Sequence, residues 1–281
     1  MREKLARKGI DLGGFQQKQD ESLGLKGQAI REPRDAERFL SHVGLALRYG
    51  PTKGLPLASL YRAFAGHEPD KAALTRGIAL TNRLLGEACA IEVQVVADRV
   101  TLIHRSVMPS LYALLRRGRA LNDLTGLSVG ARTAFSLLRE RKEITAGDLR
   151  QHLGLPFDAR RDPAYAALGE LQRLLLVDRG PFQIPESGIP YLSKEGYPYH
   201  FFHEAHPDLT EASSRYSVST AAEEFLAAYL KGAVFARVRM LATLFKALLS
   251  SEEIEAGVQR LARKRKIGMG TSGRDTIVFS T

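Results

Sequence analysis

Five residues whose side chains can bind metals or move protons lie close together late in the chain. They are His200, His203, Glu204, His206 and Asp208. Histidine and carboxylate are usual zinc ligands, but this string lacks the His-Glu-x-x-His form that sets two histidines on one helical face. Phe201 and Phe202 within the string indicate local packing instead. We therefore predict no metal site, while Glu204 or Asp208 activating a water molecule stays open as an alternative.

Basic and amide side chains form a second set of residues that could bind a partner. Lys and Arg number 41 against 31 Asp and Glu, and the resulting net charge of +10 favours a polyanionic partner. Arginine can donate two parallel hydrogen bonds to guanine or to a phosphate group, and glutamine can form a pair of hydrogen bonds with adenine. One group of such residues near the C-terminus predicts DNA contact: Gln259, Arg260, Arg263, Lys264, Lys266 and Arg274. The alternative is a solvated helix end, where Lys and Arg also suit the helix dipole.

Three smaller basic groups precede this one. The first group consists of Arg76, Arg83 and Arg99, and the second of Arg160, Arg161, Gln172 and Arg173. Both are candidate DNA contacts. Packing of one repeat on another is the stronger alternative for both groups. The third is a basic knot after a predicted helix, formed by Arg116, Arg117 and Arg119. A phosphate clamp and a capping or domain-packing role are equally compatible with that knot.

Hydrophobic periodicity predicts the elements that would present these groups. In residues 35–107, apolar residues at helical spacing predict three helices. The alternation in Ile91–Val96 and Val100–His104 then predicts a β-hairpin. Three helices followed by a hairpin is the order of a winged helix, which lays its third helix in the major groove and its hairpin on the flanking backbone.

The same order recurs twice, in residues 108–210 after a linker helix and in residues 211–281. Thr145-Ala-Gly-Asp148 and Ser250-Ser-Glu-Glu253 have capping-box form, and Asp162-Pro163 supplies a cap and a first-turn proline. We therefore predict a mainly α fold with small β-hairpins, an α+β class built of three tandem winged-helix repeats.

Two segments lack this pattern. Residues 1–34 are rich in Gly, Gln and Lys without helical or strand periodicity, which predicts a flexible N-terminal arm. Residues 182–202 are crowded with Pro, Gly and aromatic side chains. That second segment is a long wing or an inter-domain packing loop, and it is the candidate surface for a protein partner.

Several classes of protein are disfavoured by the sequence. No apolar run approaches the roughly 18 residues of a spanning helix, and the N-terminus lacks signal-peptide character. The single cysteine, Cys89, cannot form an intramolecular disulfide and is predicted to pack in the core. The Gly-rich phosphate loop, the nucleophile elbow and the dinucleotide fingerprint are missing. We expect a cytoplasmic, nucleoid-associated protein that needs no cofactor and binds no membrane.

Four stretches within and beside the second repeat carry a family resemblance: Met108–Leu115, Leu127–Arg132, Ile144–Arg150 and Ala167–Arg173. Together they resemble the AlkZ-related winged-helix proteins, relatives of the bacterial AlkZ family of DNA glycosylases that unhook alkylated bases and crosslinks. The segments Ala36–Leu40 and Leu57–Tyr61 are similar to the start of that branch. The resemblance thus spans roughly residues 35–260 by pattern.

The resemblance implies a place to look for catalysis. The glycosylases carry a Gln-aliphatic-Gln or Gln-aliphatic-Asp motif that positions the hydrolytic water. Here the candidate is Gln17-Lys18-Gln19-Asp20, with Lys18 where an aliphatic residue belongs. Gln17 and Gln19 are thus candidate catalytic residues, and a solvated arm is the alternative that the lysine favours.

Three hypotheses on function follow. The leading one is a non-enzymatic protein that binds double-stranded DNA in DNA repair or transcription regulation. The first alternative is an AlkZ-like DNA glycosylase that excises alkylated or crosslinked bases. The second is a protein-assembly module that uses the aromatic segment, residues 182–202.

Overall fold

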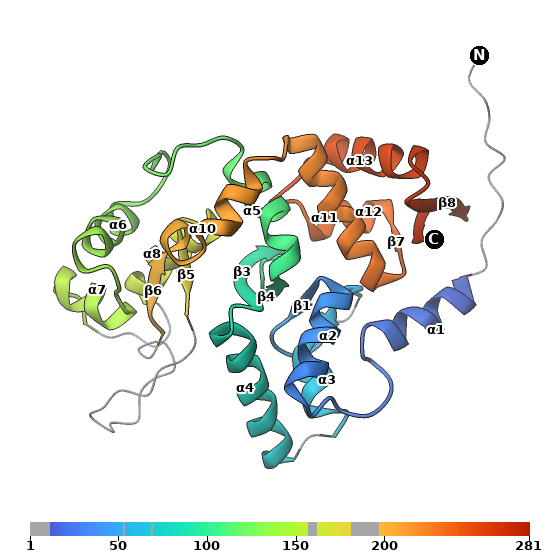
Figure 1. Ribbon diagram of the computed structural model, residues 1–281, viewed down its shortest axis with the longest axis horizontal. Helices are drawn as coiled ribbons and strands as arrows, with labels where there is room; N and C mark the ends of the chain where they lie inside the picture. The colour runs from blue at the N-terminus through green and yellow to red at the C-terminus, as the bar shows by residue number, and fades with distance from the viewer. Residues whose placement is uncertain (1–11, 53, 69, 157–161, 181–196) are drawn as a thin grey trace.

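Helices dominate the molecule, and three small sheets are distributed among them (Figure 1). In this computed structural model, residues 12–52, 54–68, 70–156, 162–180 and 197–281 are described. The predicted mixed class, mainly α with small β-hairpins, is confirmed. Among the described residues, none of the helices combines the length and apolar character that crossing a lipid bilayer requires.

The first unit of the chain contains a four-stranded sheet flanked by three helices. Its elements are α2 (Pro33–Val43), β1 (Leu45–Leu47), β2 (Ala58–Ser59), α3 (Leu60–Ala65), α4 (Lys71–Gly86), β3 (Ala90–Val96) and β4 (Arg99–His104). The sheet order is β2-β1-β4-β3, so the first strand pairs with the last. Helix α4 begins where the Asp70 carboxylate accepts a hydrogen bond from the main-chain N–H of Ala73 at 2.7 Å.

The second unit repeats this order with a shorter first strand. Its elements are α6 (Val129–Arg141), α7 (Ala146–Leu153), α8 (Pro163–Arg173), β5 (Val177–Arg179) and β6 (Tyr199–Phe201). The first strand is reduced to a single bridge between Ile144 and Tyr199. The predicted capping box of Thr145 and Asp148 starts α7, and Asp162 caps α8 just before its first-turn proline.

The third unit repeats the order again. It consists of α11 (Val218–Ala233), β7 (Phe235–Arg237), α12 (Val238–Leu244), α13 (Ser251–Arg263), β8 (Ile267–Ser272) and β9 (Asp275–Ser280), with sheet order β7-β9-β8. The capping box of Ser250 and Glu253 is present as predicted. Ile254, Val258 and Leu261 are buried because their spacing sets them on one face of α13.

Short helices join the units. η1 (Arg105–Val107) and α5 (Met108–Arg116) follow the first unit, and α9 (Phe202–Ala205) and α10 (Pro207–Ser213) lie between the second and third. Helix α5 packs on both α10 and α11. The Tyr112 ring stacks on the Phe202 ring at 5.1 Å between centroids, which ties α5 to α9.

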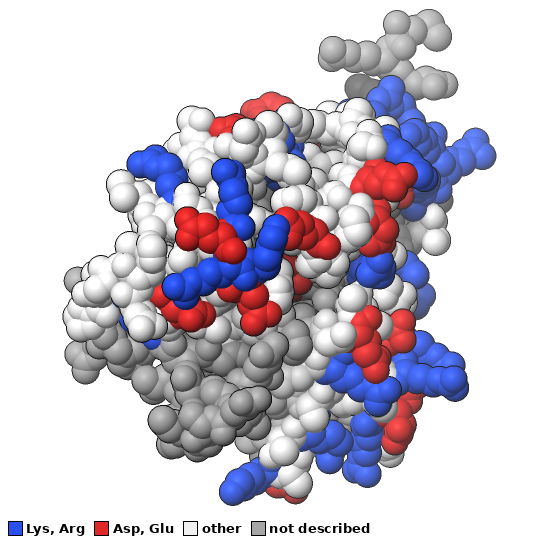
Figure 2. Space-filling view, turned by 60° about the vertical axis from the view of Figure 1, so that its left-hand side comes forward, with Lys and Arg blue, Asp and Glu red and all other residues white. Residues whose placement is uncertain are grey.

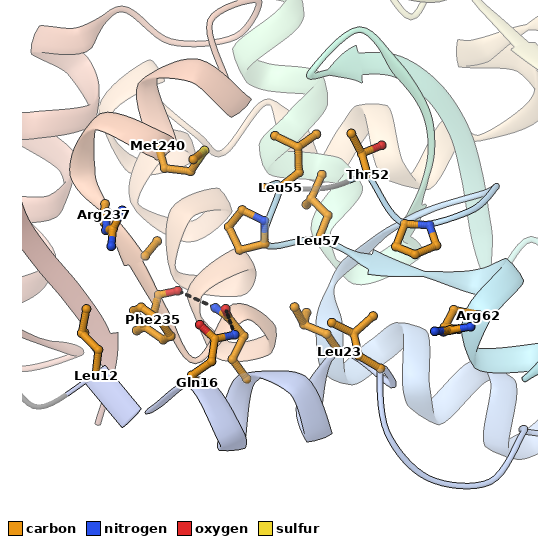
Figure 3. A pocket seen from close by; sticks show the side chains of 16 residues that line it. Leu12, Gln16, Leu23, Thr52, Leu55, Leu57, Arg62, Phe235, Arg237 and Met240 are labelled. Carbon is orange, nitrogen blue, oxygen red and sulfur yellow. Dashed lines mark hydrogen bonds between the residues drawn. The ribbon is translucent and has the colours of Figure 1, made fainter. Parts of the chain in front are cut away.

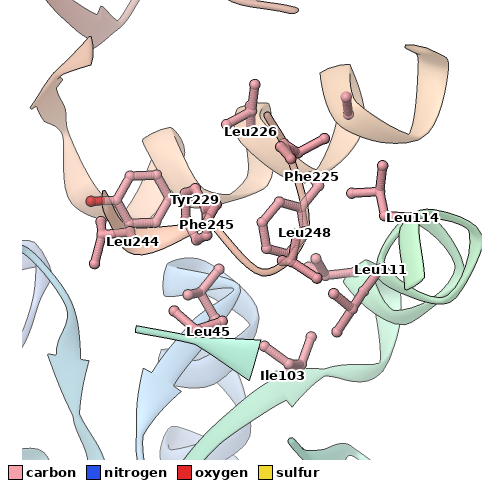
Figure 4. Close-up of a cluster of buried hydrophobic side chains, with 14 of the residues drawn as sticks. Leu45, Ile103, Leu111, Leu114, Phe225, Leu226, Tyr229, Leu244, Phe245 and Leu248 are labelled. Carbon is pink, nitrogen blue, oxygen red and sulfur yellow. The ribbon is translucent and has the colours of Figure 1, made fainter. Parts of the chain in front are cut away.

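One apolar core runs through the first and third units and α5 (Figure 4). Leu45 and Ile103 from the first sheet meet Leu111 of α5 and Phe225 of α11 in this core. The α2–α11 contact is especially close, since a Cβ added to Gly232 would lie 2.4 Å from Val43 Cα. Only glycine permits the two backbones to approach in this way.

The N-terminal segment differs from the predicted flexible arm. Residues Leu12–Ser22 form α1, which runs along the third unit toward the first (Figure 1). The Phe15 ring packs 5.2 Å from the Phe279 ring, and Ser22 Oγ donates to the Gly232 carbonyl at 2.6 Å. The segment escaped prediction because its few apolar contacts are made with residues more than 200 positions away. Residues 1–11 lie outside the described part of the chain.

Candidate nucleic-acid interface

Helix α13 and the strand pair that follows it carry the group of predicted DNA contacts near the C-terminus. Gln259 and Arg263 are exposed there, and Arg274 is exposed at the β8–β9 turn. Among the residues that the structure describes, neither Arg263 nor Arg274 pairs with a carboxylate, and the neutral Gln259 amide has no hydrogen-bond partner. They are therefore available to bind phosphate oxygens or base edges.

The other three basic residues predicted to contact DNA in this region bind carboxylates on α11. Arg260 Nε donates to Glu223 at 2.6 Å, and Lys264 Nζ donates to the second oxygen of the same carboxylate. Lys266 binds Glu224 at 2.9 Å. Burial would raise the pKa of Glu223, but Lys264 and Arg260 outweigh that effect and lower it. The helix packing therefore gives each of these three predicted DNA contacts a carboxylate partner.

Two carboxylates share the outward face of α13. Glu255 and Glu252 are exposed about one and two turns N-terminal of Gln259. A hydrogen bond from the Ser250 side chain lowers the pKa of Glu252, so this group stays ionised. The face is thus basic only in its C-terminal half and in the adjoining strand pair.

The first unit offers a mixed set of cations. Arg83 on α4 is paired with Glu87 at 2.6 Å, Arg76 is half-buried, and Arg99 is exposed at the β3–β4 turn. That turn packs on the third unit, because the Ala97 N–H donates to the Leu244 carbonyl at 2.9 Å. Lys246 pairs with Asp98 at 2.8 Å beside it. The hairpin of this unit therefore serves inter-unit packing.

Two of the four DNA contacts predicted in the second unit lie in the described part of the chain. Gln172, predicted to contact DNA, is buried and donates Nε2 to the Glu92 carbonyl at 2.9 Å, because α8 packs on β3. Arg173 is exposed. Arg160 and Arg161 lie outside the described residues. On the face that Figure 2 shows, basic and acidic side chains are interspersed rather than gathered into one basic stripe.

A buried charge cluster joins the first two units, and sequence analysis did not identify it. The Glu92 carboxylate accepts hydrogen bonds from Arg48 and Arg179, and the three side chains are 1%, 9% and 5% exposed. Burial would lower the pKa of both guanidiniums, but the Glu92 carboxylate outweighs it and raises both. The Arg179 guanidinium also lies 4.2 Å from the centroid of the Tyr197 ring. The cluster therefore joins β3, β5 and the residue that follows β1.

The basic knot after α5 is also used internally. Arg116 is buried and donates to the carbonyls of Leu174 and Ala120 at 3.3 and 2.5 Å. Arg117 binds both carboxylate oxygens of Glu253, at 2.7 and 3.0 Å. Arg119 lies 3.8 Å from Asp123. Of the two alternatives for this knot, the contacts favour capping and packing.

The two glutamines proposed for catalysis point in different directions. Gln19 is buried, and its Nε2 donates to the carbonyls of Ala233 and Phe235 at 2.5 and 2.9 Å. Gln17 is exposed and donates to Glu21 at 3.2 Å. Residues two apart on a helix lie about 200° apart, so both amides cannot hold one water. The observed contacts give these glutamines structural roles.

The two carboxylates proposed as alternatives lie on the surface. Glu204 is 45% exposed and pairs with Lys142 at 3.5 Å, and Asp208 is 57% exposed and pairs with Arg105. Neither side chain appears among the residues lining the described cavities.

The histidine string does not converge on one point. His206 Nε2 lies 2.8 Å from Asp178, and His200 lies 3.4 Å from Glu143. The His203 ring packs against the Phe201 ring at 5.5 Å. Within the described ranges, no group of three or more His, Cys, Asp or Glu is placed to hold a metal ion.

The remaining predicted features fall partly outside the described residues. Of the aromatic segment 182–202, residues 182–196 lie outside, while Tyr197, Tyr199, Phe201 and Phe202 are buried. Cys89 is half-buried beside the core of the first unit. Burial, together with Glu37 and Glu87, raises the pKa of its thiol, which disfavours the thiolate that nucleophilic attack requires.

Comparison with known proteins gives one structural relative. No family model matches the chain, and no curated protein matches it in sequence. The fold is similar to that of Streptomyces sahachiroi DNA glycosylase AlkZ, with a TM-score of 0.55 and 13% sequence identity. The likeness covers 93% of this chain and 67% of the AlkZ chain. The predicted resemblance is therefore confirmed at the level of the fold.

Proposed function

We propose that this protein binds double-stranded DNA through three tandem winged-helix domains, residues 35–107, 108–210 and 211–281, and does not excise bases. Each unit has the helix, strand, helix, helix, strand, strand order of a winged helix, with β2 added in the first unit and the first strand of the second unit reduced to a bridge. In each unit the first strand pairs with the last. The observation that carries DNA binding is the fold likeness to a DNA glycosylase over 93% of the chain.

The charge distribution supports this proposal. The chain carries a net charge of +10. The third unit supplies exposed cations on its third helix and strand pair, namely Arg263 and Arg274, and the earlier units add Arg99 and Arg173. Arginines at such positions bind phosphate oxygens, and that affinity falls steeply as salt rises. Arg76 and Arg83 remain additional candidates on α4.

The contacts of the candidate catalytic residues favour a non-enzymatic role. A base excision site needs a carboxylate or amide beside the flipped nucleotide, free to hold water. The Gln19 amide instead donates to two main-chain carbonyls, and Glu204 and Asp208 form surface ion pairs. We infer that the protein acts in DNA repair as an accessory factor or in transcription regulation, at the nucleoid in the cytoplasm.

Base excision is the second candidate function. The fold likeness to AlkZ favours it, since AlkZ is a DNA glycosylase. It requires a catalytic arrangement other than the Gln17 and Gln19 pair. A protein partner docking through residues 182–202 is compatible with either function.

One experiment separates these functions. Undamaged and alkylated duplexes are titrated by fluorescence anisotropy at 50 and 200 mM salt, and the mixtures are then treated with alkali to reveal abasic sites. We expect salt-sensitive binding without strand breaks, with a loss on the order of 100-fold over this range for about four phosphate contacts. Breaks confined to alkylated DNA would establish the glycosylase, and absence of DNA binding would leave a protein-assembly module.

Matched variants locate the interface. Arg263→Ala combined with Arg274→Ala removes two exposed cations and is expected to weaken binding about tenfold and to flatten the salt dependence. Arg215→Ala removes a cation that is 77% exposed just after the end of α10, outside the proposed interface, and serves as the control. Equal affinities for both variants would place the interface elsewhere.

A further inference from the structure

A cavity lies where three distant parts of the chain meet. Its volume is about 610 Å³, within the range of small-molecule sites, and it is bounded by α1, residues 51–52 and 54–57, and the β7–α12 junction. Figure 3 shows Leu55 and Leu57 on one side, Leu23 below, and Phe235 and Met240 on the third unit. Most of the lining is therefore apolar, which suits a ligand with an apolar body.

The charged groups of this cavity are all of one sign. Among its described lining residues, Arg62 and Arg237 are charged and none is acidic. In Figure 3 these arginines lie on opposite sides of the apolar side chains that line the cavity. The cavity therefore combines an apolar centre with a cation at either end.

Each arginine retains capacity for an anion. Arg62 Nη1 donates to the His67 carbonyl at 2.9 Å, and its Nη2 has no hydrogen-bond partner among the described residues. Arg237 shares the Asp275 carboxylate with Arg239, at 3.4 and 3.0 Å. One carboxylate thus faces two guanidiniums, which leaves a net positive charge at that end.

We propose that this cavity binds a small amphipathic organic anion, with a carboxylate, sulfonate or phosphate group on an arginine and an apolar chain or ring over the leucines. A nucleic-acid backbone is a poor match, because a polyanion gains nothing from apolar walls. Residues 1–11 carry Arg2, Lys4, Arg7 and Lys8, and like charge disfavours them as a ligand for two arginines. This ligand site is independent of the proposed DNA binding.

The test is a titration of the full-length protein with anilinonaphthalene sulfonate, an aromatic anion that fluoresces in apolar sites. We expect saturable binding of one dye per chain, and displacement by decanoate at concentrations at least tenfold lower than by decanol. Displacement by both at equal concentrations would overturn the anionic character of the site.

Variants place the dye in the cavity. Met240→Trp fills the cavity from a partly exposed position and is expected to weaken dye binding more than tenfold. Leu55→Trp fills it from the opposite wall and replaces Met240→Trp if the latter does not fold. Arg62→Gln and Arg237→Gln are each expected to weaken decanoate binding five- to tenfold while leaving decanol unchanged.

Controls keep this site separate from DNA binding. Val129→Trp adds the same bulk at a 71% exposed position on α6, and Arg139→Gln removes an exposed α6 cation. Dye binding that responds equally to Val129→Trp and to Met240→Trp would overturn the proposal. Duplex affinity is measured on every variant, so loss of the dye site with retained DNA binding distinguishes the two functions.

Discussion

The Glu92 carboxylate on β3 binds the Arg179 guanidinium on β5, although both side chains are almost completely withdrawn from water. Arg48 binds the other oxygen of the same carboxylate. A buried ion pair adds little over an apolar replacement, but removal of one partner leaves an uncompensated buried charge. Here one missing carboxylate would leave two buried guanidiniums.

Glu92→Gln should therefore destabilise the fold by about 3–5 kcal/mol. Chemical denaturation followed by circular dichroism measures this loss. Glu87→Gln removes a carboxylate whose partner, Arg83, is 56% exposed, and should cost less than about 1 kcal/mol. Equal losses of unfolding free energy for the two variants would show that the buried cluster stabilises the fold no more than an exposed ion pair does.

Acid stability should depend on Glu253. Hydrogen bonds from Arg117 and from the Ser250 backbone lower the pKa of Glu253 from 4.5 to about 2. Because the pKa of the folded state lies below the ordinary value, the stabilisation is complete above about pH 4.5 and disappears as the pH falls toward 2. Glu253→Gln should remove this part of the pH dependence of unfolding.

The pH series of denaturation curves needs a carboxylate without such contacts as its control. Glu211 is 78% exposed, and its partner Arg215 is 4.0 Å away. Glu211→Gln should leave the acid limb of the stability curve where it is. An unchanged acid limb in Glu253→Gln would contradict the role assigned to the Arg117 contact.

The two glutamines of α1 should behave differently on truncation. Gln19→Ala leaves the carbonyls of Ala233 and Phe235 without a donor and should cost about 1–3 kcal/mol. Gln17→Ala removes an exposed contact and should change stability by less than about 0.5 kcal/mol. Amide hydrogen exchange in Leu12–Ser22 provides a local readout, and faster exchange is expected only for Gln19→Ala.

The approach of α2 to α11 should tolerate no side chain at Gly232. A Cβ there would lie 2.4 Å from Val43 Cα and 2.7 Å from its carbonyl oxygen, both backbone atoms. Gly232→Ala should thus destabilise by at least about 1–3 kcal/mol, although alanine favours helices. Gly169→Ala in α8 meets nothing within 4 Å and should be neutral or stabilising in the same thermal melts.

The acidic half of the α13 face should oppose DNA binding. Glu255 is exposed on the same face as Gln259 and Arg263. Glu255→Gln should strengthen binding to duplex DNA severalfold at low salt, with a smaller gain at 200 mM salt, because exposed charges are screened. Weaker or unchanged binding in the anisotropy titration would show that α13 does not face DNA.

Local signals in the sequence predicted much of the fold. The capping residues Thr145, Asp162 and Ser250 and the inward spacing of Ile254, Val258 and Leu261 depend on neighbours within one or two turns. Such patterns are visible in sequence because the groups that satisfy one another are only a few positions apart.

The candidate site was harder to predict, because its contacts join distant segments. Gln172 looks like an exposed polar residue in its own helix, yet it bonds to Glu92 80 positions away. Arg260 donates a hydrogen bond to Glu223, which lies on another helix 37 positions away. Periodicity assigns a residue to a face of its own helix but does not tell which element covers that face.

The turn between β3 and β4 bears on how the molecule unfolds. Ala97 and Asp98 attach it to the third unit, and β3 attaches the first unit to the second through Glu92. The first unit is therefore held on both sides, and its core continues into the third. Although a similar order of elements recurs in the three units, the first and third units do not have separate cores. We expect a single cooperative melting transition, and a repeat excised from the chain would expose the apolar surface it now shares.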